Sequence, residues 1–141
     1  MVQKKVSVYL NGELVQAKEN ETVIDVARRN GIDIPHFCWN RRLERIGACR
    51  ICVVEVEGTP ELVASCSTPV RDGMKIKTHT LRVLEARRMN LELLLANHDL
   101  NCTICQRNLT CRLQEYAHDL MIQETPFAGK KRSEEPDYSS T

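Results

Sequence analysis

Seven cysteines and one histidine form two groups whose spacing suits metal binding. The first group has gaps of ten, two and thirteen residues and consists of Cys38, Cys49, Cys52 and Cys66. The second has gaps of three, two and five residues and consists of His98, Cys102, Cys105 and Cys111. Because the number of cysteines is odd, a framework of disulfides alone would leave one thiol over. Two four-ligand sites, in contrast, use every cysteine in the chain.

The four-cysteine group predicts an iron–sulfur centre. Thiolates are the ligands that iron bridged by sulfide prefers, and we expect a [2Fe–2S] cluster here. Cys49 and Cys52 are close enough in sequence to bind one iron, which would leave Cys38 and Cys66 for the second iron. The small pair Gly47-Ala48 would let the backbone approach the cluster. A four-cysteine zinc site is the alternative, although zinc ribbons usually contain two pairs of this spacing. Four unrelated buried thiols are a third possibility.

The second group offers one imidazole and three thiolates within fourteen residues. These gaps suit a cubane [4Fe–4S] cluster in which each iron has one protein ligand. A zinc ion bound by the same histidine and three cysteines remains open on spacing alone.

The segments around the first group predict a small mixed sheet with one helix. Residues 5–10 alternate between apolar and polar, and Asn11-Gly12 favours a type I′ hairpin turn before a second strand at residues 14–17. Apolar spacing predicts a helix over residues 23–30, with Thr22 and Asp25 as a capping box. Three further strands are expected at residues 50–57, 62–65 and 74–78. This order of elements is β-grasp-like.

The segments around the second group predict helices. Thr80 is a suitable N-cap for a helix over residues 81–96, on which we expect Arg87 and Arg88 to be solvated. A shorter helix is expected over about residues 109–120. The polar sequence from Gly129 onward resembles a linker or tail. The expected domains are residues 1–79, 80–124 and 125–141.

Composition and hydropathy argue against two classes of protein, those that bind nucleic acids and those that insert into membranes. The 141 residues contain 20 Lys and Arg against 19 Asp and Glu, a balance that argues for no nucleic-acid partner. The N-terminus lacks the apolar stretch of a signal peptide, and no apolar run is long enough to insert into a membrane. We therefore expect a cytoplasmic protein, or one at the cytoplasmic face of a membrane complex.

Several other residues near the candidate ligands have ordinary explanations. His36 is expected to be a polar or surface histidine, and Trp39 a lid over the first site. Arg41, Arg42 and Arg45, in the loop between Cys38 and Cys49, are expected to be solvated; the alternatives are that they offset the charge of a cluster or dock an acidic partner.

The two motifs together resemble one known family. The spacing around GACRIC, residues 47–52, is similar to the N-terminal [2Fe–2S] domain of the large iron–sulfur subunit of respiratory complex I. The same domain opens NAD-linked and electron-bifurcating [FeFe]-hydrogenases, the diaphorase iron–sulfur subunit of NAD-reducing hydrogenases, and NAD-dependent formate dehydrogenases. HDLNCTICQRNLTC, residues 98–111, resembles the one-histidine, three-cysteine [4Fe–4S] motif that follows it. The resemblance covers roughly residues 4–120 and implies an α+β chain: a ferredoxin-like [2Fe–2S] domain and a small helical [4Fe–4S] module.

The resemblance also implies a function. The chain would relay single electrons between a flavin- and NADH-binding subunit and the catalytic subunit of a hydrogenase, formate dehydrogenase or NADH:quinone oxidoreductase. It contains no GxGxxG, no Walker loop and no nucleophile–base pair, so no self-contained active site is expected. A zinc-stabilised protein-interaction module and a free-standing soluble ferredoxin are the alternatives.

Overall fold

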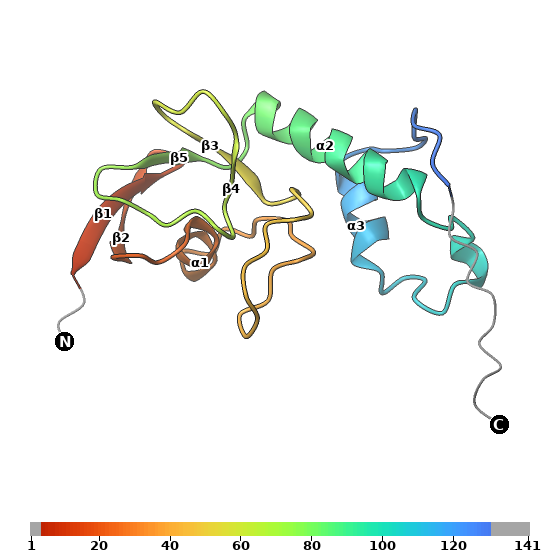
Figure 1. Ribbon diagram of the computed structural model, residues 1–141, viewed down its shortest axis with the longest axis horizontal. Helices are drawn as coiled ribbons and strands as arrows, with labels where there is room; N and C mark the ends of the chain where they lie inside the picture. The colour runs from red at the N-terminus through yellow and green to blue at the C-terminus, as the bar shows by residue number, and fades with distance from the viewer. Residues whose placement is uncertain (1–3, 131–141) are drawn as a thin grey trace. The chain divides into compact units, whose positions relative to one another are not determined.

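The computed structural model describes residues 4–130. The chain divides into two compact units, the first ending at Arg87 and the second beginning at Arg88. The first contains the sheet, helix α1 and the start of helix α2; the second contains the rest of α2 and the loops and short helices that follow (Figure 1). No helix within residues 4–130 has both the length and the apolar character needed to cross a membrane.

The predicted N-terminal hairpin is confirmed. Strand β1, Lys5–Leu10, pairs antiparallel with β2, Glu13–Lys18. Asn11 and Gly12 between them have φ values of 53° and 92°. Both are positive, as a type I′ turn requires, and Asn and Gly tolerate this conformation best.

The other strands are shorter than predicted but lie in the expected places. They are β3 at Val53–Val56, β4 at Val63–Ala64 and β5 at Lys75–Lys77. The sheet order is β2-β1-β5-β3-β4, and only the pairing of β1 with β5 is parallel. The segment before β3 is a turn rather than a strand, because Arg50 has a φ of 54°, which interrupts the extended backbone. The mixed sheet matches the predicted β-grasp-like α+β class.

Helix α1, Val23–Arg29, covers the sheet (Figure 1). Its Val23, Ile24, Val26 and Ala27 are buried in the core with the inward residues of the strands. The predicted capping box is wrong: the Thr22 hydroxyl donates to the Asp25 carboxylate at 2.6 Å and makes no bond to a backbone N–H.

Helix α2, Leu81–Ala96, begins as predicted, because the Thr80 hydroxyl accepts a bond from the Val83 N–H at 3.3 Å. Its two adjacent arginines differ. Arg88 is exposed and forms an ion pair with Glu92 at 2.9 Å. Arg87 is only 1% exposed, so the expectation that it is solvated is wrong.

The second unit contains little regular structure beyond α2. A single 3₁₀ turn covers Cys102–Ile104, and helix α3 covers Arg112–Asp119. The predicted start of α3 at Leu109 is wrong, since that residue has a φ of 66° and is 93% exposed. The start of the predicted tail contacts α2, where the Thr125 hydroxyl donates to the Glu92 carbonyl at 3.1 Å. The rest of that tail, from residue 131, lies outside the described residues.

Candidate metal centres

The structure brings the four cysteines of the first group together in two pairs. The sulfur atoms of Cys38 and Cys49 lie 3.4 Å apart, and the thiols of Cys52 and Cys66 form a second hydrogen-bonded pair. This differs from the expected pairing of Cys49 with Cys52. The reason is the path of the chain: β3 and β4 are neighbouring strands, and Cys52 and Cys66 lie at their adjacent ends.

The raised pKa of the Cys66 thiol reflects the closeness of all four sulfur atoms. Burial raises the pKa of this thiol, and the hydrogen bond and charge of Cys52 add to that effect. The negative charges of Cys38 and Cys49 raise it further, to about 12. Four thiolates this close repel one another strongly without a cation. Iron would remove that penalty, so the donor set fits a positively charged metal centre.

The Cys49 sulfur has the opposite environment. Burial opposes ionisation, but the backbone N–H groups of Cys38, Ile51 and Phe37 donate to the sulfur and lower its pKa overall. The thiol of Cys38 adds to this effect. Amide donors aimed at a ligand sulfur stabilise the thiolate that a metal requires. The sequence predicts that the backbone comes close to the centre at Gly47-Ala48, but it did not identify these three donors, because backbone groups carry no residue-type signal.

Two left-handed residues shape this loop. Gly47 is buried with a φ of 63°, and Arg50, between Cys49 and Cys52, has a φ of 54°. A side chain at Gly47 would contact the Ser67 hydroxyl at 3.4 Å in a backbone conformation that costs roughly 1–2 kcal/mol outside glycine. The small residue expected here is therefore needed for its conformation as well as its size.

The core holds the ligand segments in place. The Ser65 N–H donates to the Cys52 carbonyl at 3.0 Å, and the Ile24 N–H of α1 donates to the Ser65 carbonyl at 3.1 Å. Cys52 and Cys66 are each 1% exposed and belong to the hydrophobic core. The first site is therefore anchored in the packing of the sheet and α1.

His36 and Trp39 pack together beside Cys38. Contrary to the expectation of a surface position, His36 is buried; its Nδ1–H donates to the Ile34 carbonyl at 2.8 Å. Its ring meets the Trp39 ring edge-on, with centroids 4.9 Å apart. Within residues 4–130, the buried indole N–H of Trp39 has no hydrogen-bond partner. This donor lies one residue from a ligand cysteine, where a cluster would supply sulfur acceptors.

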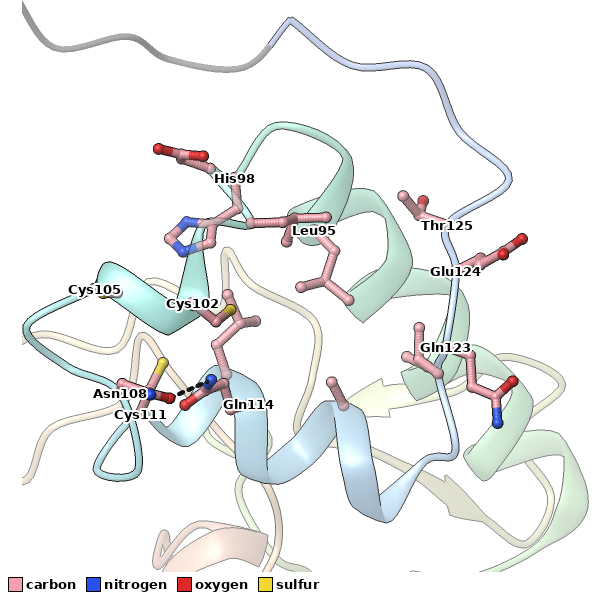
Figure 2. Close-up of a pocket in the computed structure, with 15 residues that line it drawn as sticks. Leu95, His98, Cys102, Cys105, Asn108, Cys111, Gln114, Gln123, Glu124 and Thr125 are labelled. Carbon is pink, nitrogen blue, oxygen red and sulfur yellow. Dashed lines mark hydrogen bonds between the residues drawn. The ribbon is translucent and has the colours of Figure 1, made fainter.

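The second group of ligands lines one cavity of about 190 Å³ in the second unit (Figure 2). All four predicted ligands contribute to its wall: His98, Cys102, Cys105 and Cys111. The cavity is far larger than the roughly 10–15 Å³ that one water molecule needs. Three thiols and an imidazole around a space of this size fit a cubane cluster. Among the described residues, no three His, Cys, Asp or Glu side chains are arranged around a single ion position.

Three elements position these ligands: the end of α2, the 3₁₀ turn and the start of α3. His98 follows the end of α2, where its N–H still donates to the Leu95 carbonyl at 3.1 Å. Cys102 begins the 3₁₀ turn, and the Cys105 N–H closes it by donating to the Cys102 carbonyl at 3.2 Å. Cys111 is the N-cap residue of α3. A bond of 3.0 Å from the Gln114 amide to the Asn108 side chain braces the loop between them (Figure 2).

Two family models match the chain. The model described as "2Fe-2S iron-sulfur cluster binding domain" covers residues 3–81. The model described as "NADH-ubiquinone oxidoreductase-G iron-sulfur binding region", of the 4Fe-4S type, covers residues 87–126. Each matched range contains one complete set of the predicted ligands.

The curated relatives align with most of this chain, but the aligned region is only a small part of each relative's own length. The NADP-reducing hydrogenase subunit HndD of Solidesulfovibrio fructosivorans is 41% identical, over 90% of this chain and 23% of its own length. The NADH-ubiquinone oxidoreductase 75 kDa subunit of Reclinomonas americana is 46% identical, over 78% of this chain and 16% of its own length. The chain thus spans less than a quarter of these relatives.

One solved structure is similar in fold. A chain in the crystal structure of NAD⁺-reducing [NiFe]-hydrogenase in the H₂-reduced state superposes with a TM-score of 0.84 at 28% identity. The match covers 92% of this chain and 55% of that chain.

Proposed function

This chain belongs to the family of 2Fe–2S iron–sulfur cluster binding domains, and from that premise we propose that it relays single electrons within a multi-subunit redox complex. It has one [2Fe–2S] binding domain and one [4Fe–4S] binding region. The observation that carries the proposal is the convergence of four thiols in the first unit, with backbone donors aimed at one of them.

For the first cluster, the proposed ligands follow the pairs of the structure. Cys38 and Cys49 would bind one iron, because their sulfur atoms lie 3.4 Å apart, and Cys52 and Cys66 would bind the other. When bound, this cluster takes up and releases one electron. The chain's own contribution is to hold the thiolates together, to donate amide hydrogen bonds to Cys49 and to exclude water from Cys52 and Cys66.

For the second cluster, the proposed ligands are the four residues around the cavity: His98, Cys102, Cys105 and Cys111. A neutral imidazole replaces one anionic thiolate, which raises the reduction potential in Rieske centres. We expect the same direction here.

The proposed partners are a flavin- and NADH-binding subunit and a catalytic subunit. The relatives are subunits of a hydrogenase and of an NADH-ubiquinone oxidoreductase, which supports a place in a complex of that type. The loop between Cys38 and Cys49 offers a contact surface beside the first site. It exposes Leu43 and Ile46 next to Arg42 and Arg45, of which Arg45 forms an ion pair with Asp25 at 2.8 Å. Exposed apolar side chains beside a basic residue suit an apolar surface with acidic margins.

An anaerobic electron titration tests the relay. The purified chain is titrated with dithionite and then reoxidised, while its visible absorption is followed. We expect reversible bleaching with uptake of about one electron per cluster. A colourless chain that takes up no electrons would overturn the proposal and favour the zinc-stabilised interaction module. A matched sample with Cys38→Ala should take up fewer electrons, because only the second cluster would remain.

A further inference from the structure

One buried charge remains without a role in the relay. Arg87 in α2 is the largest fully buried side chain among the described residues, at 1% exposure. Its Nη2 donates to the Val53 carbonyl of β3 at 2.9 Å. Both residues lie in the first unit, with the four-cysteine site.

A permanent cation at this position is unusual. Arginine remains protonated at any pH at which proteins fold, so burial cannot neutralise it. Burying a charge is costly, and arginine is rarely fully buried unless its environment compensates for that cost. Apolar side chains could fill the same space between α2 and β3. The position of the charge, rather than the volume of the side chain, is therefore the feature that needs a reason.

The bonded carbonyl lies in the backbone that carries the first site. Val53 directly follows Cys52 and pairs across the sheet with Ala64, two residues before Cys66. On the other side of Cys52, the Ile51 N–H donates to the Cys49 sulfur. The guanidinium is thus bonded to the backbone next to Cys52. The same stretch of backbone donates to Cys49 through Ile51, and its strand partner Ala64 lies two residues before Cys66.

We propose that Arg87 sets the reduction potential of the four-cysteine centre by holding a buried positive charge beside its ligand strand. This inference rests on the proposed [2Fe–2S] site. Reduction adds one electron to the centre and therefore one negative charge. A nearby cation stabilises the reduced form and raises the potential, and burial protects that interaction from screening by salt.

The adjacent residue supplies a matched control. Arg88 carries the same charge one position later on the same helix, but its side chain is half exposed and pairs with Glu92. Water and salt screen such a charge, so its effect on the centre is small. Comparing variants of Arg87 and Arg88 therefore shows whether the midpoint potential depends on the buried charge or on any arginine of α2.

The test is an EPR-monitored redox titration of the reduced [2Fe–2S] signal in the whole chain. Arg87→Gln removes the charge and keeps an amide donor for the Val53 carbonyl; Arg87→Lys keeps the charge. We expect a more negative midpoint potential in Arg87→Gln, a smaller shift in Arg87→Lys and none in Arg88→Gln. The potential of the second cluster is the internal reference.

Two results would overturn the inference. One is an unchanged midpoint potential in Arg87→Gln with an intact signal. The other is an equal shift in Arg87→Gln and Arg87→Lys, which would mean that altered geometry matters and the charge does not. If Arg87→Gln fails to hold the cluster, the Lys variant decides: a wild-type potential supports the charge, and a strong negative shift contradicts it. Absence of any reduced-cluster signal in the wild-type chain would instead defeat the proposed function.

Discussion

The two ligand sets are built in opposite ways. The first set is spread over residues 38–66, and two of its cysteines are part of the hydrophobic core. The second set lies within residues 98–111, where His98 and Cys105 are exposed. Among residues 88–130, only Leu91, Glu92, Ala96 and Tyr116 are buried.

This difference shows where each site obtains its geometry. The core of the sheet and α1 consists of ordinary apolar packing and includes Cys52 and Cys66, so we expect it to place the first ligands without help from a metal. The second unit has too few buried residues to do the same, and small domains of this kind usually depend on a metal for cohesion. Cluster binding and folding should therefore be separable in the first unit and coupled in the second.

Removal of both clusters should have the largest effect, and only in the second unit. After anaerobic treatment with acid and chelator, we expect hydrogen exchange in α3 to accelerate by at least roughly 100-fold, about 2.7 kcal/mol. Amides of β1 and β5 should remain protected, because their bonds belong to the core sheet. Equal loss of protection in both units would contradict the difference.

Replacing one buried ligand should remove one cluster. In Cys52→Ala we expect loss of the [2Fe–2S] signal with the [4Fe–4S] signal retained, and a stability loss of only about 1 kcal/mol in the sheet. Cys105→Ala is the matched variant in the second set and should show the reverse pattern of signals. Loss of both signals in either variant would mean that the two sites are not independent.

Replacing the histidine should alter a potential without removing a cluster. His98→Cys keeps four ligands but adds a negative charge, so we expect a lower midpoint potential for the [4Fe–4S] cluster. The control is His118→Gln, because His118 is an exposed residue of α3 away from the cavity wall. An unchanged potential in His98→Cys would argue that His98 is not a ligand.

The smallest effect is expected within the first site of the cluster-free chain. Cys49 has a lowered pKa, so its thiolate should form at a lower pH than that of an ordinary thiol. Burial and three neighbouring thiols raise the pKa of Cys66 to about 12, so it should stay protonated at neutral pH. Iodoacetamide labelling followed by mass spectrometry measures both pH profiles. A lower midpoint for Cys66 than for Cys49 would contradict the arrangement of donors around Cys49.

Local patterns predicted this molecule well, and features formed by distant segments were missed. Asn11-Gly12 indicated its turn from two residues, and spacing divided the eight candidate ligands into two groups, because both patterns depend on neighbours in sequence. The pairing of Cys52 with Cys66 depends instead on β3 lying beside β4. The burial of Arg87 depends on its contact with β3, where its Nη2 donates to the Val53 carbonyl, 34 residues away in sequence. None of these contacts has a periodic or spacing signal.

Anaerobic metal analysis combined with EPR of the reduced chain tests most directly whether the two ligand sets hold iron–sulfur clusters. We predict about six irons per chain, no stoichiometric zinc, and two reduced-cluster signals with different temperature dependence. One or two zinc ions per chain with no reduced-cluster signal would contradict the assignment of both sites.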